Sequence, residues 1–154
     1  MNIYKNNLHK LLYIIVIGFG IGYLPFSGTI ATIISSIVWY CIASVNNFNV
    51  LKFIVITILS TLLCHIINNH SNIKDHYSIV LDEFIGTGII ILLLPDNSFI
   101  EILFSIFLFR VLDIIKPWPI SYLNNINNGF GIMADDILAA LITIGIILLL
   151  KNFI

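Results

Sequence analysis

The sequence predicts an all-α fold: a polytopic membrane helical bundle with about five spanning helices and a glycine-rich N-terminal segment that either crosses the membrane or re-enters it. The chain has 154 residues, of which 59% are hydrophobic and 10% are charged, whereas soluble domains contain roughly 25% charged residues. A chain this short cannot bury so much apolar surface in its own core. The apolar residues form long segments without the period-2 alternation of a membrane β-barrel.

Six apolar segments can be marked along a single expected domain that covers residues 1–154. The second to the sixth have 17 to 19 residues, and a spanning helix needs roughly 17–25 residues. The segments run over residues 11–24, 29–45, 50–67, 77–94, 98–116 and 134–150.

The first segment is weaker than the others because it contains helix breakers. The run Gly-Phe-Gly-Ile-Gly begins at Gly18 and is followed by Pro25 and Gly28. Glycine costs about 1 kcal/mol in a helix interior, and proline interrupts a helix. The longest connection, residues 117–133, holds two prolines and two glycines, so we expect no continuous helix through it.

Ionisable residues within or at the ends of apolar segments carry most of the functional information. A charged side chain inside a membrane costs at least ~2.5 kcal/mol on insertion scales, so such residues usually face a bundle interior. They form three groups: Asp82 and Glu83 in the fourth segment, Arg110, Asp113 and Lys116 at the end of the fifth, and Asp135 and Asp136 at the start of the sixth.

The order of the segments predicts that these groups meet at one face of the membrane. If the second to sixth segments all cross, the starts of the second, fourth and sixth segments lie on the same side as the end of the fifth. Gly28 and Thr29, at the start of the second segment, then lie beside the charged groups. The three charged residues of the fifth segment are spaced by three, so they line one helix face.

The positive-inside rule gives an orientation only if the first segment is re-entrant. The face that holds the carboxylates then carries Lys5, Lys10, Lys74, Arg110 and Lys116, and the other carries Lys52 and Lys151. If the first segment spans, two lysines change sides and the count is 3 against 4, which decides nothing. We expect the carboxylate face to be cytoplasmic.

Most of these residues also have a simpler structural interpretation, but Asp82 and Glu83 do not, because they lie in an apolar segment with no cation nearby in the sequence. Asp135 and Asp136 would cap a helix, because carboxylates are favourable at helix N-termini. Arg110 and Lys116 would extend to lipid head groups, and Thr29 would be an N-cap. The functional interpretation gains weight because five of the eight carboxylates gather at one face beside two cations.

A carboxylate cluster of this kind is typical of a site for a hard, oxygen-preferring cation such as Mg²⁺. Mg²⁺ together with lysine and arginine suits phosphate oxygens, because metal ions polarise a phosphoryl group and stabilise the leaving oxygen. At a membrane surface the available phosphate belongs to a lipid head group. A net charge of -1 gives no indication of nucleic-acid binding.

The charged groups lie in three stretches: DHYSIVLDEFIG (Asp75–Gly86), FRVLDIIKPWPI (Phe109–Ile120) and GFGIMADDILA (Gly129–Ala139). These stretches resemble the motifs of the phosphatidylglycerophosphatase A family, and the resemblance spans nearly the whole chain. The glycine-rich run near Gly18 and the Gly28-Thr29 pair are similar to the N-terminal motif of that family, although Ser27 stands where the family usually has a proline.

The resemblance implies a multi-pass enzyme of the bacterial inner (plasma) membrane that uses Mg²⁺ to hydrolyse phosphatidylglycerophosphate to phosphatidylglycerol and phosphate in phospholipid metabolism. The number of metal ions, the choice between water attack and a phospho-enzyme, and the oligomeric state are left open. On this basis Mg²⁺ binding or water activation is expected from Asp82, Glu83, Asp113, Asp135 and Asp136, and phosphate binding from Arg110, Lys116 and Thr29.

The alternative is a membrane ion or metal transporter that uses the same carboxylates. Clustering of the charges toward one face disfavours this alternative, because a transport pathway needs polar residues at several depths. A lipid-head-group transferase is a third class, but the D-G-x2-A-R signature of the alcohol phosphatidyltransferases is absent from the sequence.

Overall fold

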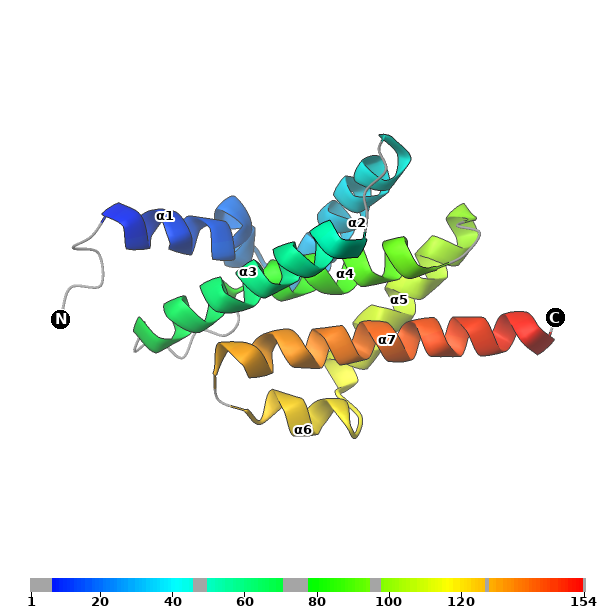
Figure 1. Cartoon of the computed structure of the whole chain (residues 1–154). Coiled ribbons are helices and arrows are strands. Elements are labelled where there is room, and N and C mark those ends of the chain that lie inside the picture. The colour runs from blue at the N-terminus through cyan, green and yellow to red at the C-terminus, as the bar shows by residue number, and fades with distance from the viewer. Residues whose placement is uncertain (1–6, 46–49, 71–77, 95–97, 127, 154) are drawn as a thin grey trace.

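The computed structural model describes residues 7–45, 50–70, 78–94, 98–126 and 128–153, and every regular element in these ranges is a helix (Figure 1). The all-α prediction is therefore confirmed for this part of the chain. The elements are α1 (Asn7–Val16), the 3-10 helix η1 (Gly18–Tyr23), α2 (Ser27–Val45), α3 (Val50–His70), α4 (Leu81–Leu93), α5 (Phe99–Ile115), α6 (Ile120–Asn124) and α7 (Gly129–Phe153).

Three of the described helices are long and apolar enough to cross a membrane. They contain the candidate spans Ser27–Ser44, Val50–Asn68 and Gly129–Asn152, which belong to α2, α3 and α7. The helices α4 and α5 have 13 and 17 residues, or about 20 and 25 Å, whereas the hydrocarbon core is about 30 Å thick. The membrane character is supported, and the number of five spans stays a prediction.

The glycine-rich N-terminal segment is not one helix. α1 ends at Val16, and the chain turns within η1 at Phe19 and Gly20, where φ is 55° and 103°. The Val80 amide donates a hydrogen bond to the Val16 carbonyl at 3.1 Å, which fixes the end of α1 beside the start of α4. A continuous helix through residues 11–24 is excluded, and re-entry stays a prediction.

The starts of α4 and α7 differ from the expected positions in a way that affects the charged residues. α4 begins at residue 81 instead of 77, and α7 begins at residue 129 instead of 134. Asp82 and Glu83 therefore lie in the first turn of α4, whereas Asp135 and Asp136 lie almost two turns inside α7. The interpretation of these two aspartates as N-terminal caps is wrong, since a cap stands where the helix begins.

The connection after α5 contains more helix than its prolines and glycines indicate. It holds α6 and the first turn of α7, separated between Asn124 and Gly129. The expectation that no continuous helix runs through this connection is confirmed. Lys5, Lys74 and residues 75–77, which begin the acidic stretch, lie outside the described residues.

The helix α7 contacts α3, α4, α5 and α6, and α2 packs against α4 and η1. Figure 1 shows α3, α4 and α7 running roughly side by side, with α6 below the first half of α7. The core lies where these helices meet and includes the fully buried Ile85, Ile90 and Phe109. This packing holds the first turn of α4 against the second turn of α7.

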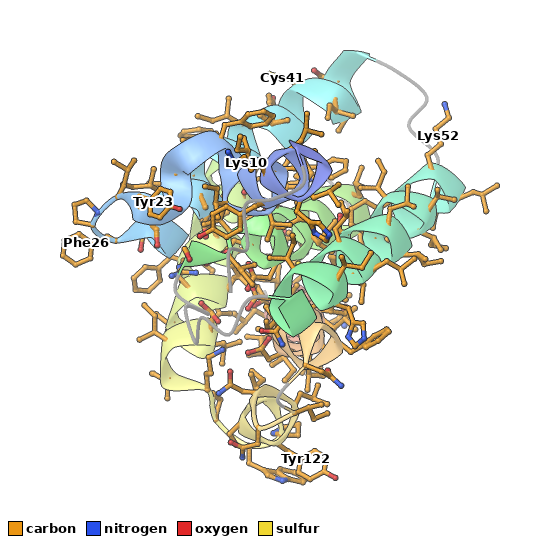
Figure 2. All side chains as sticks on the ribbon, turned by 90° about the vertical axis from the view of Figure 1, so that its left-hand side faces the viewer. Lys10, Tyr23, Phe26, Cys41, Lys52 and Tyr122 are labelled. Carbon is orange, nitrogen blue, oxygen red and sulfur yellow. The ribbon has the colours of Figure 1, made fainter. Side chains whose placement is uncertain are left out.

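Many apolar side chains point away from this core, as expected for a surface that faces lipid. Ile37 on α2 and Leu51 and Leu59 on α3 are more than half exposed. Figure 2 shows such side chains projecting outward, together with Phe26 and Tyr122 at the edge of the molecule. The exposed surface therefore agrees with the membrane class predicted from composition.

Candidate active site

The first turn of α4, the end of α5 and the second turn of α7 bring all seven predicted charged residues together. Arg110 Nη1 lies 2.8 Å from Asp113 Oδ2 and 3.6 Å from Glu83 Oε1, which links α5 to α4. Lys116 Nζ lies 3.4 Å from Asp113 Oδ1 and donates a hydrogen bond to Asp135 Oδ2, which links α5 to α7. The predicted convergence of the three groups is confirmed.

The five carboxylates form two overlapping groups. We call Asp82, Glu83 and Asp136 the first group: each offers an oxygen atom, and these atoms lie within 4.8 Å of one another. Asp113, Asp135 and Asp136 meet the same condition and are called the second group. Asp136 belongs to both groups.

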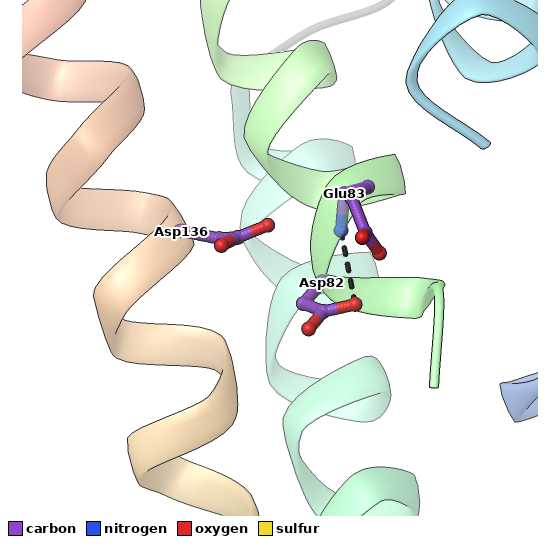
Figure 3. Close-up of side chains that lie close together, drawn as sticks. All are labelled: Asp82, Glu83 and Asp136. Atoms are coloured by element: carbon purple, nitrogen blue, oxygen red, sulfur yellow. Dashed lines mark hydrogen bonds between the residues drawn. The ribbon is translucent and has the colours of Figure 1, made fainter. Parts of the chain in front are cut away.

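Figure 3 shows how the first group is assembled. The side chain of Asp136 points from α7 toward the first turn of α4, where Asp82 and Glu83 lie. The Glu83 amide donates a hydrogen bond to Asp82 Oδ1 at 3.1 Å, which is the dashed line in the figure. Side chains from two helices thus face a common point.

Several of these carboxylates are buried without full compensation. Glu83, Asp135 and Asp136 are 8%, 3% and 3% exposed. Within the described part of the chain, Glu83 Oε2 and Asp136 Oδ2 have no hydrogen-bond partner. An unsatisfied buried polar atom costs roughly 1–3 kcal/mol, and a charged one costs more. Such atoms fit ligands of a hard cation, which prefers carboxylate oxygens.

Lys116 reaches the site because α5 ends at this residue. Lys116 is the C-cap of α5 and has left-handed backbone angles (φ 45°, ψ 58°), and its amide donates to the Leu112 carbonyl at 2.8 Å. The next residue is Pro117, which disfavours helical angles in the residue before it. The chain therefore leaves the helix at Lys116, next to α7.

Gly28 brings the start of α2 against the Glu83–Arg110 ion pair. A Cβ atom at this position would lie 2.5 Å from Glu83 Oε1 and 2.7 Å from Arg110 Nη2, so a residue larger than glycine does not fit without displacement. The first amide groups of a helix have no intrahelical acceptor and attract anions. Thr29, the eighth predicted site residue, is exposed in this turn. The residue of α2 that lies against Glu83 and Arg110 is its neighbour Gly28.

A set of buried hydroxyl groups joins α2 to α4 directly beside Glu83. Thr87 Oγ1 lies 2.8 Å from Ser35 Oγ and 2.8 Å from the Glu83 carbonyl oxygen. Thr32 Oγ1 donates to the Gly28 carbonyl at 2.7 Å. These residues were not predicted. Their signal in the sequence is the placement of Thr32 and Ser35 three residues apart in an apolar segment, which puts them on one helix face.

Comparison with known proteins identifies the family of this chain. The sequence profile described as phosphatidylglycerophosphatase A matches residues 14–151. The chain belongs to the phosphatidylglycerophosphatase A family. The matched region contains every predicted site residue, so the resemblance is confirmed over most of the chain.

Curated members of the phosphatidylglycerophosphatase A family are similar over most of their length. The phosphatidylglycerophosphatase A of Escherichia coli (strain K12) is 35% identical over 139 residues, which cover 88% of this chain and 80% of the relative. The protein of the same name from Haemophilus influenzae is 36% identical over 143 residues, covering 89% and 86%. No solved structure matches the chain.

A third relative carries a different name. The putative phosphatidylinositol-3-phosphatase of Bacteroides thetaiotaomicron is 30% identical over 130 residues, which cover 79% of this chain and 82% of the relative. The names of all three relatives describe lipid phosphatases. Family membership therefore supports the predicted enzyme class, a phosphatase of phospholipid metabolism, and does not favour the transporter alternative.

Proposed function

We propose that this chain hydrolyses the phosphate monoester of phosphatidylglycerophosphate to give phosphatidylglycerol and phosphate, and that it uses Mg²⁺. The observation that carries the proposal is the pair of overlapping carboxylate groups beside Arg110 and Lys116. The choice of lipid is supported by the names of the Escherichia coli and Haemophilus influenzae relatives.

The residues proposed to hold the cation are Asp82, Glu83, Asp113, Asp135 and Asp136. The buried oxygens without partners fit this role, since they would gain a ligand that the described chain does not supply. Mg²⁺, when bound, would polarise the phosphoryl group, lower the pKa of bound water and stabilise the leaving oxygen.

Arg110 and Lys116 are proposed to bind the phosphate. The planar guanidinium group of arginine matches two phosphate oxygens at once, and the ammonium group of lysine acts as a compact charge. The side chain of Lys116 is 30% exposed, whereas that of its partner Asp135 is 4% exposed, so the lysine can turn toward an incoming head group. Thr29, exposed at the start of α2, would contact the same phosphate.

We also propose that α2, α3 and α7 cross the membrane with the site near the cytoplasmic face. At the far end of the bundle, Lys151 Nζ lies 2.5 Å from Glu101 Oε1 and joins the end of α7 to the start of α5. Because α1 ends at Val16, we propose that it does not cross the membrane and that Lys10 stays on the side of the site, where it adds to the positive charge of Arg110 and Lys116.

The decisive experiment measures phosphate release by the purified chain in proteoliposomes that contain phosphatidylglycerophosphate, with and without EDTA. We expect hydrolysis that stops in EDTA and returns with excess Mg²⁺. Full activity in EDTA would contradict the metal requirement. Faster hydrolysis of phosphatidylinositol 3-phosphate under the same conditions would overturn the choice of lipid, and ion flux without phosphate release would restore the transporter alternative.

A further inference from the structure

The two carboxylate groups share one residue. An ionised carboxylate has two oxygens and about four lone-pair sites, so it can serve two cations at once. Asp136 is the member common to both groups. It is also 97% buried, with its Oδ2 atom lacking a partner among the described residues. Paired metal ions that act on phosphate lie about 3.5–4 Å apart, a separation that a bridging carboxylate permits.

The two groups differ in the cations that already contact them. In the first group, Arg110 Nη1 lies 3.6 Å from Glu83 Oε1. In the second group, Arg110 Nη1 lies 2.8 Å from Asp113, and Lys116 Nζ contacts both Asp113 and Asp135. The ammonium group of Lys116 therefore contacts two of the three carboxylates that would hold an ion in the second group.

The total charge also favours more than one ion. Five carboxylates and two cations leave three formal negative units when every group is ionised. One divalent cation would leave the site negative and repulsive toward a phosphate, whereas two would make it positive by one unit. A site that binds an anionic substrate needs the net positive charge that two ions provide, since a positive field attracts a negatively charged ligand.

We propose that the site binds two divalent ions of unequal affinity, with Asp136 as their shared ligand and Lys116 as a competitor for the second position. The first group fills first because its ion pair with Arg110 is longer, at 3.6 Å, whereas the second group is held by Arg110 at 2.8 Å and by Lys116. The second position fills when the ammonium group of Lys116 moves away, as it does when it turns to a phosphate. This inference rests on the proposed use of a metal by the site.

Mn²⁺ titration followed by electron paramagnetic resonance tests this inference without substrate. The purified chain in detergent should bind two Mn²⁺ in two separate steps, and the loaded protein should show the signal of a spin-coupled pair. Lys116→Met should tighten the second step by about tenfold, because it removes a positive charge from the second position. Lys151→Met is the matched control, since that lysine pairs with a distant carboxylate, and it should titrate like the wild type.

Aspartate variants identify the shared ligand. Asp136→Asn should abolish the coupled signal, Asp113→Asn should lose the weaker step alone, and Asp82→Asn should weaken the tighter one. If Asp136→Asn does not fold, as judged by circular dichroism and gel filtration, the other two variants decide the assignment. One Mn²⁺ per chain in both the wild type and Lys116→Met would overturn the inference, as would an unchanged second step in Lys116→Met.

The outcome is separable from that of the proposed function. Two coupled Mn²⁺ ions in a chain that releases no phosphate from phosphatidylglycerophosphate would leave the inference standing and refute the function. A single Mn²⁺ in a chain that releases phosphate from this lipid would refute the inference and leave the function standing.

Discussion

The two ends of the helical bundle both carry buried or half-buried charges, but they balance them differently. At the far end, Glu101 at the start of α5 forms an ion pair with Lys151 at the end of α7. At the site end, five carboxylates share Arg110 and Lys116. A balanced ion pair is accounted for as a link between two helices. An unbalanced cluster of buried carboxylates is destabilising unless protonation or a bound cation compensates the excess negative charge.

The comparison predicts that loss of one site carboxylate is far more damaging than loss of the far-end pair. Asp113→Asn should lower the rate of phosphate release by at least about a thousandfold, the scale of losing a major electrostatic contribution to catalysis. The protein should remain folded and inserted in the membrane. Glu101→Gln is the matched control and should stay within about twofold of the wild type. A near-normal rate for Asp113→Asn would mean that the site is elsewhere.

Metal removal should lower the stability of the folded chain, and this effect should depend on residues at the site end and not on those at the far end. Mg²⁺ at about 100 times its dissociation constant should stabilise the folded chain by about 2.7 kcal/mol, because it relieves repulsion between carboxylates. The measurement is thermal unfolding in detergent with Mg²⁺ or with EDTA. Glu101→Gln should keep this Mg²⁺-dependent shift in Tm, and Asp136→Asn should lose most of it. Equal shifts in both variants would place the cation outside the carboxylate groups.

Gly28 offers a test of how tightly α2 must approach the ion pair. Gly28→Ala should lower activity by about ten- to a hundredfold, because its methyl group would displace Glu83 or Arg110, and small misplacements of catalytic groups are costly. Gly145→Ala is the control: a Cβ atom there would meet no other atom within 4 Å, so this change should leave activity intact and stabilise α7 by up to about 1 kcal/mol. Equal activities of Gly28→Ala and Gly145→Ala would show that the close approach of α2 to the ion pair is not needed for catalysis.

The smallest expected effect concerns the hydroxyl contact between α2 and α4. Thr87→Val should cost about 1 kcal/mol of stability and lower kcat less than tenfold, with KM nearly unchanged, because Thr87 joins the turn of α4 that carries Glu83 to Ser35 on α2. Thr87→Ser should restore the rate. Thr143→Val removes a buried hydroxyl that bonds within α7 to the Ala139 carbonyl, and it should change stability alone. Failure of serine to rescue would indicate a packing role for Thr87.

Much of the site was predictable because order along the chain limits where residues can meet. The predicted charged residues on α4, α5 and α7 do come together, since helices that alternate in direction bring every second end to the same side. The contact between Lys116 and Asp135 was not predictable from spacing, because it depends on where α5 stops and how closely α7 passes.

The helix boundaries also could not be predicted fully from the sequence, because they depend on contacts between helices. Glycines at the start of α7 indicated a loop, yet α7 begins at Gly129, which packs against the backbone of His65 with no room for a Cβ atom. Close packing of the two helices compensates for the low helix propensity of glycine, about 1 kcal/mol relative to alanine. This tertiary contact is why Asp135 and Asp136 lie inside a helix and face α4 and α5.

By itself, the sequence determined the all-helical membrane class, the break in the N-terminal segment, the family, and the charged residues of the site. Hydropathy and motif spacing suffice for these properties because they depend on which residues occur and in what order. The tertiary structure alone decided that Asp136 is shared by two carboxylate groups, that Lys116 stands in the second of them, and that Gly28 closes the site from α2. These features depend on side-chain distances between helices, which are set by packing and not by position along the chain.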